Sequence, residues 1–266
     1  MRAAPTYGVR SRRAVSTAGI RQTARTYGKA RIGTYAAKAD GHITVESDAE
    51  RLTAHILSID PRVRSFKQQP FTVDLVGERL LFTRAEVSEA RKGRGRHRGA
   101  AEYTPDFATV QAEGLQRAYE VKLEGYEGDS AYWSKVERAK AIMDAYCYSL
   151  STVVVPTEER HPILVNVQLL KPVLTRSHAY LNSEIIDRVE QYCESGPVLQ
   201  RDLCGDLQIP TSLIPPLLVT GVLQADLAHQ HISGSLQLSA AYGDLGHLCL
   251  IENLVAREPF SRGLLP

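Results

Sequence analysis

Cysteine is scarce in this sequence, and long apolar runs are missing. The four cysteines among the 266 residues are Cys147, Cys193, Cys204 and Cys249, and no two of them form a CxxC pair. This spacing argues against a zinc ribbon and against a disulfide framework. The sequence has no run of 18 apolar residues, and its basic N-terminus lacks a continuous apolar segment. Neither a membrane span nor a secretory signal is therefore indicated, and we expect a cytoplasmic protein with reduced thiols.

Charge is distributed unevenly, although the net charge is only +2. Residues 1–45 carry seven Arg and two Lys against one acid, whereas residues 181–266 carry four Arg and no Lys against ten acids. The basic end, which includes Arg12 and Arg13, mixes arginines with tyrosines, threonines and small residues. That mixture is typical of an arm that lies along phosphates, although a solubilising tail is an alternative. We predict that residues 1–44 are a basic N-terminal arm that contacts DNA.

The pattern after residue 44 predicts an α/β domain, and the 43 % apolar content is sufficient for its core. Apolar residues recur at helical spacing up to Asp60-Pro61, which ends the first helix. The further expected elements are strands at 62–76 and 79–83, a strand hairpin around Gly114, an amphipathic helix at 130–150 and a short strand at 151–156. We place this domain at residues 45–178 and expect a mixed sheet flanked by helices.

Residues 179–266 predict a C-terminal winged-helix domain. Three short helical stretches, separated by glycines, precede strand-like sequence, which is the layout of that fold. The third stretch, TSLIPPLLVTGVL, has no Arg, Lys, Asn or Gln before Gln224, although reading of bases needs such side chains. The acidic balance also disfavours phosphate. We therefore expect this domain to contact a protein partner rather than DNA.

The most informative stretch is AEYTPDFATVQAEGLQRAYEVKLEGY, residues 101–126. Glu120 and Lys122 are two apart on a predicted strand and share one face, whereas Val121 points into the core and offers its carbonyl as a ligand. Carboxylate oxygens suit Mg²⁺, so Asp106 and Glu120 on adjacent strands are predicted metal ligands. Lys122 would orient or help to deprotonate water. Pro-Asp, a hairpin and Glu-x-Lys resemble the PD-(D/E)-x-K pattern of restriction-endonuclease-like folds.

Two neighbouring features fit the same chemistry. Glu50, on the first predicted helix, offers a further acid. The glycine-rich stretch EARKGRGRHRG directly precedes the motif, and we expect it to be a loop beside a phosphate backbone. Its candidate DNA contacts are Arg91, Lys92, Arg94, Arg96 and Arg98. The alternative to this whole interpretation is an ordinary Glu/Lys pair on a solvated strand face, with Asp106 in a simple turn.

Taken together, these motifs resemble TnsA, the endonuclease subunit of heteromeric cut-and-paste bacterial transposons. The matching segments are Ser47–Glu50, Asp60–Pro70, Asp106 and Glu120–Lys122, within roughly residues 40–155. Gln69 belongs to the predicted strand that carries the matching Gln69-Pro70 dipeptide. It either touches the site or caps that strand. The C-terminal domain is similar only in its layout.

The resemblance implies ligands and partners. Glu50, Asp106 and Glu120 would hold Mg²⁺, with Mn²⁺ as a substitute and two ions expected, and Lys122 would be the base that positions water. Glu46 is the alternative to Glu50, although it lies at the frayed start of the helix. TnsA cuts the 5′ ends of an element, a DDE-type transposase subunit, TnsB, cuts and joins the 3′ ends, and an AAA+ ATPase, TnsC, regulates both. The expected partners are therefore double-stranded DNA at transposon ends, a TnsB-like transposase and a TnsC-like ATPase, the last through the C-terminal domain.

Two other functions stay open. A free-standing PD-(D/E)-x-K nuclease for restriction or repair would carry the same site, but it would have to find its own target without base-reading residues in the C-terminal domain. A catalytically silent DNA-binding regulator on the same scaffold is disfavoured because all four site residues are present. The leading hypothesis is a Mg²⁺-dependent endonuclease that cuts the 5′ ends of a transposon.

Overall fold

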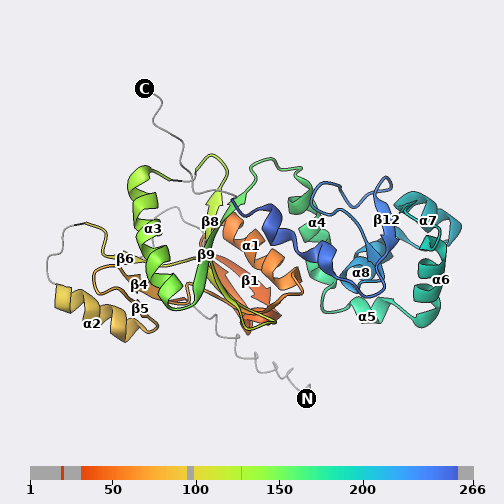
Figure 1. Cartoon of the computed structure of the whole chain (residues 1–266). Helices are drawn as coiled ribbons and strands as arrows, with labels where there is room; N and C mark the ends of the chain where they lie inside the picture. Colours follow the sequence, from red (N-terminus) through yellow and green to blue (C-terminus); the bar gives the residue numbers. More distant parts are fainter. Residues whose placement is uncertain (1–18, 21–30, 95–98, 127, 257–266) are drawn as a thin grey trace, which may run out of the picture.

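The computed structural model describes residues 19–20, 31–94, 99–126 and 128–256. Figure 1 shows an elongated molecule, in which a central sheet lies between a smaller α/β unit at one end and a group of short helices at the other. None of the helices in these ranges is long and apolar enough to cross a membrane.

The central sheet is mixed and has the strand order β3-β7-β8-β9. Its strands are β3 (Val63–Gln68), β7 (Phe107–Gln111), β8 (Gln116–Leu123) and β9 (Tyr148–Val155). β7 is antiparallel to both β3 and β8, whereas β8 and β9 are parallel. Gly114, between β7 and β8, has φ +81°, a conformation that a residue with a Cβ rarely adopts. The predicted hairpin and the predicted mixed α/β fold are confirmed.

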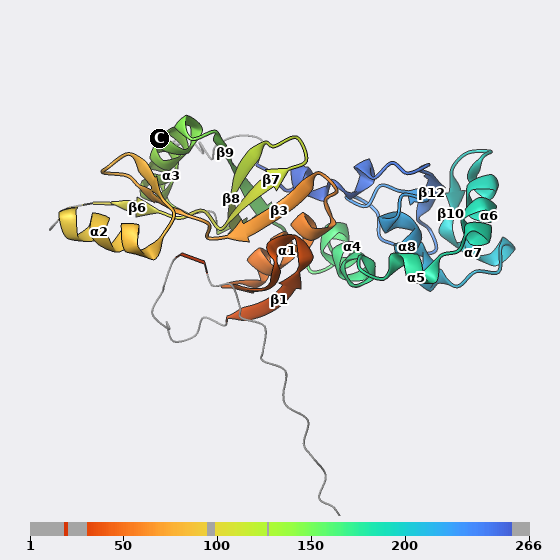
Figure 2. The ribbon, with the colours of Figure 1, turned by 90° about the horizontal axis from the view of Figure 1, so that it is seen from below.

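The two faces of this sheet are covered by different helices. Val121 belongs to an apolar cluster with α1 (Asp48–Ile59), whereas Ala118 belongs to a second cluster with α3 (Ser130–Ala145). Figure 2 shows α1 and α3 on opposite sides of the sheet. Because side chains alternate along a strand, Glu120 lies on the α3 side with Ala118.

Helix α1 ends where the sequence predicts, but it begins at Asp48, so Glu46 precedes the helix rather than forming its frayed start. The side chain of Ser47 accepts a hydrogen bond from the backbone N–H of Glu50, which caps the first turn. The buried side chains Leu52, Ile56 and Ile59 form its apolar face. Such an amphipathic helix is stabilised mainly by packing of that face against the sheet.

Part of the stretch predicted to be a basic loop, residues 89–94, is helical, and the loop prediction is wrong for these residues. Helix α2 spans Arg84–Arg94 and packs beside a three-stranded sheet of order β5-β4-β6. These strands are β4 (Thr72–Asp74), β5 (Arg79–Leu81) and β6 (Glu102–Tyr103). The helix begins with a reciprocal cap, because the Thr83 hydroxyl accepts from the Glu86 N–H and the Glu86 carboxylate accepts from the Thr83 N–H. This cap and the buried Val87 and Ala90 outweigh the one glycine of the helix, Gly93. Arg96 and Arg98 lie outside the described residues.

The end of the predicted N-terminal arm is also folded. Strands β1 (Ile32–Ala36) and β2 (Gly41–Val45) form an antiparallel hairpin, and Ala36, Ile43 and Val45 are buried in the cluster that contains α1. Residues 32–44 are therefore not an extended arm. Arg12 and Arg13 lie outside the described residues.

The C-terminal part contains short helices and a small antiparallel sheet of order β10-β12-β11. Its main elements are α4 (Pro162–Leu170), α5 (Ser177–Tyr180), α6 (Ser183–Cys193), β10 (Val198–Leu199), α7 (Gln200–Asp206), α8 (Ile214–Val219), β11 (Leu223–Gln224) and β12 (Gln237–Ala240). Helix α4 is not among the elements expected from the sequence, and it contacts both α1 and α8. One apolar cluster runs without interruption from β1 through α4 into these elements.

The chain then returns to the central sheet. After the 3-10 turn η5 (Leu250–Asn253), Val255 forms an antiparallel bridge with Val153, and Ala256 N–H donates to the carbonyl of Thr152 at 2.9 Å. The final described residues thus cover the outer edge of β9, which would otherwise expose unpaired backbone groups.

Candidate functional site

Asp106 is positioned by the end of the β7–β8 hairpin. Its backbone N–H donates to the Tyr119 carbonyl at 3.0 Å, and its carbonyl accepts from the Gln69 N–H at 2.8 Å. Its Oδ2 atom accepts from the Val121 N–H at 2.7 Å. Strand β7 begins at Phe107, which pairs with Tyr119. No backbone carbonyl of β7 therefore lies opposite Val121, and the Asp106 carboxylate accepts the hydrogen bond of the Val121 N–H instead. These bonds fix the carboxylate close to β8.

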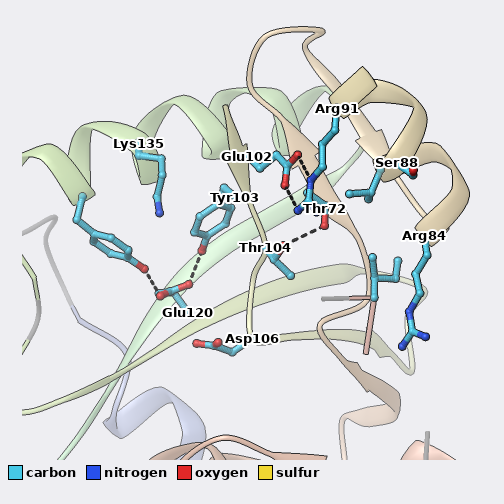
Figure 3. A pocket seen from close by; sticks show the side chains of 13 residues that line it. Thr72, Arg84, Ser88, Arg91, Glu102, Tyr103, Thr104, Asp106, Glu120 and Lys135 are labelled. Atoms are coloured by element: carbon cyan, nitrogen blue, oxygen red, sulfur yellow. Dashed lines mark hydrogen bonds and ion pairs between the residues drawn. The ribbon is translucent and has the colours of Figure 1, made fainter. Parts of the chain in front are cut away.

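Glu120 lies on β8, next to that contact, and its side chain is surrounded by donors. It is 5 % exposed. The Tyr103 hydroxyl donates to Oε2 at 2.6 Å, and Lys122 Nζ lies 2.8 Å from Oε1. The Tyr132 hydroxyl also donates to Oε1. A buried carboxylate needs such donors to offset the loss of water, and Figure 3 shows Tyr103 reaching Glu120 from above.

The place of Tyr132 at the start of an amphipathic helix suggests a role in core packing alone. Its hydrogen bond to Glu120 shows that it is also part of the site. It follows Asp129, the N-cap of α3, whose side chain accepts from the Tyr132 N–H. Lys122 Nζ lies 4.0 Å from the centre of the Tyr132 ring, which is cation–π distance. Tyr132 thus contacts both members of the Glu-x-Lys pair.

Glu50 approaches from the opposite face of the sheet and is held by its own helix. Its carboxylate accepts from the Glu46 N–H at 2.9 Å and from the Ser47 hydroxyl at 3.1 Å. Glu46, the alternative acid, accepts from Gln69 Nε2 at 3.4 Å. Gln69 in turn donates its backbone N–H to Asp106, so these polar groups form a connected network behind the site.

The acids of the site influence one another electrostatically. Burial raises the pKa of Asp106 well above its usual value, and the negative charges of Glu120 and Glu50 raise this pKa further. Burial also raises the pKa of Glu50, and Glu46 and Glu120 contribute to the same shift. Like charges that destabilise one another are relieved by a bound cation or by a proton. The arrangement therefore favours a cation or a proton near Asp106 and Glu120.

A pocket of about 510 Å³ opens onto Asp106 and Glu120. Its other lining residues are Ile20, Thr72, Arg84, Val87, Ser88, Arg91, Glu102, Tyr103, Thr104, Tyr132 and Lys135. In Figure 3, the α2 residues Arg84, Ser88 and Arg91 stand on one side and Lys135 of α3 on the other. The pocket therefore lies between the two helices, with the two acids on its floor.

Two of the arginines predicted to contact DNA form ion pairs with the same carboxylate, that of Glu102. Arg91 donates to both carboxylate oxygens of Glu102, at 2.8 and 2.6 Å. Arg94 donates to Glu102 at 2.8 Å, and its side chain is only 10 % exposed. Glu102 therefore competes with phosphate for both guanidinium groups, and the two DNA contacts stay predictions. Lys92 is exposed on α2 and does not line the pocket.

The structure brings together Asp106, Glu120 and Lys122, whereas Glu50 lies behind them in its helix cap. Among the described residues, no group of three or more His, Cys, Asp or Glu side chains is close enough to form a ready metal site. Sequence reasoning missed Tyr103, Tyr132 and Lys135 as parts of the site. For Tyr132 and Lys135, the only available signal was their place in the first turns of the helix behind the motif.

The third helical stretch of the C-terminal part lies in the interior. Ile214, Pro216, Leu217 and Leu218 of α8 are buried. α8 contacts α4 and α5, so its apolar face is already occupied within the chain. This packing agrees with the absence of base-reading side chains from its sequence.

Comparison with known protein families finds no match to this sequence, and no curated protein matches it either.

Proposed function

We propose that this chain is a metal-dependent DNA endonuclease. The observation that carries the proposal is the meeting of Asp106 and Glu120 from adjacent strands at the floor of one pocket, with Lys122 2.8 Å from Glu120. The element order α1-β3-β7-β8-α3-β9 supports a restriction-endonuclease-like core. The resemblance of the motifs to the PD-(D/E)-x-K pattern supports the same conclusion.

The donor set fits a hydrated Mg²⁺ ion. Mg²⁺ is usually bound by one or two carboxylates, and waters and substrate phosphates complete its shell. Asp106 and Glu120 supply two carboxylates, and the Val121 carbonyl is a third candidate ligand. Glu50 is engaged in the helix cap, so the described carboxylates fit one ion better than the two expected from the sequence. When bound, Mg²⁺ would neutralise charge on the phosphoryl oxygens and acidify a water molecule.

The protein's own residues supply positioning and charge. Val121 N–H holds the Asp106 carboxylate on the strand, and Tyr103 holds one oxygen of Glu120 from the buried side. Lys122, with a side chain 18 % exposed, lies beside Glu120 and faces the same side of the sheet. An ammonium group there would orient water and offset negative charge that develops on phosphate.

We further propose that the enzyme is a TnsA-type transposase subunit that cuts the 5′ ends of an element. The motif resemblance supports this assignment. The order of α6, β10, α7, α8, β11 and β12, with a three-stranded antiparallel sheet, supports a winged-helix domain. Because α8 is buried and lacks reading residues, target choice would come from a TnsB-like transposase and a TnsC-like ATPase. A free-standing nuclease would need its own reading surface.

Reconstituted excision tests this proposal. The complete chain would be combined with its DDE transposase and ATPase on DNA that carries both element ends. We expect Mg²⁺-dependent 5′-strand cuts that disappear with Asp106→Asn and persist with Asp144→Asn, an exposed control on α3. Persistence of the 5′ cuts with Asp106→Asn would contradict the catalytic assignment. Efficient cutting by the chain alone would favour the free-standing nuclease.

A further inference from the structure

The walls of the pocket suggest where the DNA strand lies, and the suggestion rests on the proposed endonuclease function. Arg84, Ser88 and Arg91 are spaced at i, i+4 and i+7 on α2, which places them on one face of the helix. All three line the pocket. Lys135 lines it from α3. The floor between these walls holds Asp106 and Glu120.

The three cations on these walls have different surroundings. Arg91 is neutralised by Glu102 through two hydrogen bonds. Arg84 is exposed, and its Nη2 atom donates to the backbone carbonyl of Gly19 at 3.0 Å. None of the ion pairs found within the described ranges involves Arg84. Its guanidinium therefore contacts a neutral oxygen where an anionic one would bind more strongly.

Lys135 is held in place by aromatic rings. Its Nζ atom lies 4.6 Å from the centre of the Tyr132 ring and 5.8 Å from that of Tyr103. The same two tyrosines donate hydroxyl hydrogen bonds to Glu120. The position of the ammonium group is therefore tied to the position of the candidate metal ligand.

We propose that Arg84 and Lys135 form a phosphate-binding site on opposite walls of the pocket. They would hold backbone phosphates of the cleaved strand next to the scissile one. Ser88, one turn after Arg84 on the same face, offers a hydroxyl donor. The site is separate from the Arg91 and Arg94 contacts expected from the sequence, for which Glu102 competes with phosphate.

The salt dependence of DNA binding tests this site separately from cleavage. Binding of the complete chain to an end-containing duplex would be measured without divalent metal at several salt concentrations. Each phosphate contact contributes about 0.9 to the slope of log K against log salt. We expect Arg84→Ala and Lys135→Ala each to reduce the slope by about that amount, and Arg84→Lys to restore it.

Arg160→Ala is the matched control, because it removes one positive charge from an exposed position outside the pocket. Slopes for Arg84→Ala and Lys135→Ala equal to that of Arg160→Ala would overturn the phosphate site. A different outcome would separate the two proposals. If both variants reduce the salt slope but the wild-type assembly shows no metal-dependent cutting, the endonuclease proposal fails and the phosphate site stands.

Discussion

The carboxylate of Asp106 and the backbone N–H of Val121 are joined by a 2.7 Å hydrogen bond where strand β7 ends. This bond makes the acid part of the sheet rather than of a mobile turn. It also places Asp106 beside Glu120, the residue before Val121. Burial raises the pKa of Asp106, and the neighbouring charge of Glu120 raises it further.

Replacing Asp106 should therefore stabilise the metal-free protein. Asparagine at position 106 keeps an oxygen that can accept from Val121 and removes a charge that burial and Glu120 disfavour. We expect Asp106→Asn to raise the free energy of unfolding by about 1–2 kcal/mol in chelator, as measured by urea denaturation. Asp144→Asn, on the exposed side of α3, should change it by less than about 0.5 kcal/mol. A destabilised Asp106→Asn protein would contradict the electrostatic account.

Removing the Tyr103 hydroxyl should weaken the fold at the site. Tyr103 is 3 % exposed, and its hydroxyl donates to Glu120 Oε2 at 2.6 Å. Hydrogen bonds to charged groups contribute about 1.5–3 kcal/mol, so Tyr103→Phe should lower the free energy of unfolding by that amount. Tyr126→Phe is the control, since Tyr126 is 75 % exposed. Equal melting curves for the two variants would argue against a stabilising hydrogen bond from Tyr103 to Glu120.

His55 should make stability depend on pH. Burial and the charges of Lys171 and Arg51 lower its pKa to about 4, whereas an unfolded histidine titrates near 6.5. Its stabilising contribution is complete above pH 6.5 and is lost as pH falls towards 4, because only the unfolded chain takes up a proton there. The loss should be on the order of 2–3 kcal/mol.

The control for this effect is His55→Gln, which keeps a polar group near the Thr34 hydroxyl, 2.8 Å from His55 Nε2. Unfolding free energies of both proteins would be measured between pH 7 and pH 4.5. The wild-type curve should fall more steeply than the variant curve. Parallel curves would show that His55 is not buried in its neutral form.

Asp60 should anchor the returning C-terminal segment. It is 1 % exposed and accepts from the backbone N–H, Nε and Nη2 of Arg62, while Arg62 Nη1 also donates to Glu252 at 2.5 Å. Asp60→Asn should cost about 2–3 kcal/mol of unfolding free energy. Glu252→Gln should cost less than about 1 kcal/mol, because Glu252 is 52 % exposed. The reverse order in thermal unfolding would contradict this assignment.

Much of the fold follows from local sequence signals. The Ser47 cap, the Asp60-Pro61 stop and the turn at Gly114 act within a few residues, so α1 and the β7–β8 hairpin are predictable. The Glu-x-Lys spacing likewise fixes a shared strand face. Helix α2 is mispredicted because Gly93 and the arginines suggest a loop, whereas its cap and its two buried apolar residues decide the outcome.

The missed parts of the site depend on contacts between residues far apart in the chain. Tyr103 reaches Glu120 across 17 positions, and Glu102 captures Arg91 only because β6 lies beside α2. Neither partner can be chosen from spacing alone. Glu50 is hard to predict for the opposite reason, because its contacts are local. Its hydrogen bonds to Glu46 and Ser47 compete with the metal-ligand role that the motif implies.

Metal binding tests the central claim most directly. Calorimetric titration of the metal-free chain with Mn²⁺ requires neither DNA nor partner proteins. We predict about one ion per wild-type chain, at least tenfold weaker binding for Asp106→Asn and for Glu120→Gln, and unchanged binding for Asp144→Asn. Equal Mn²⁺ affinity in all four proteins would contradict the claim that Asp106 and Glu120 form the metal site.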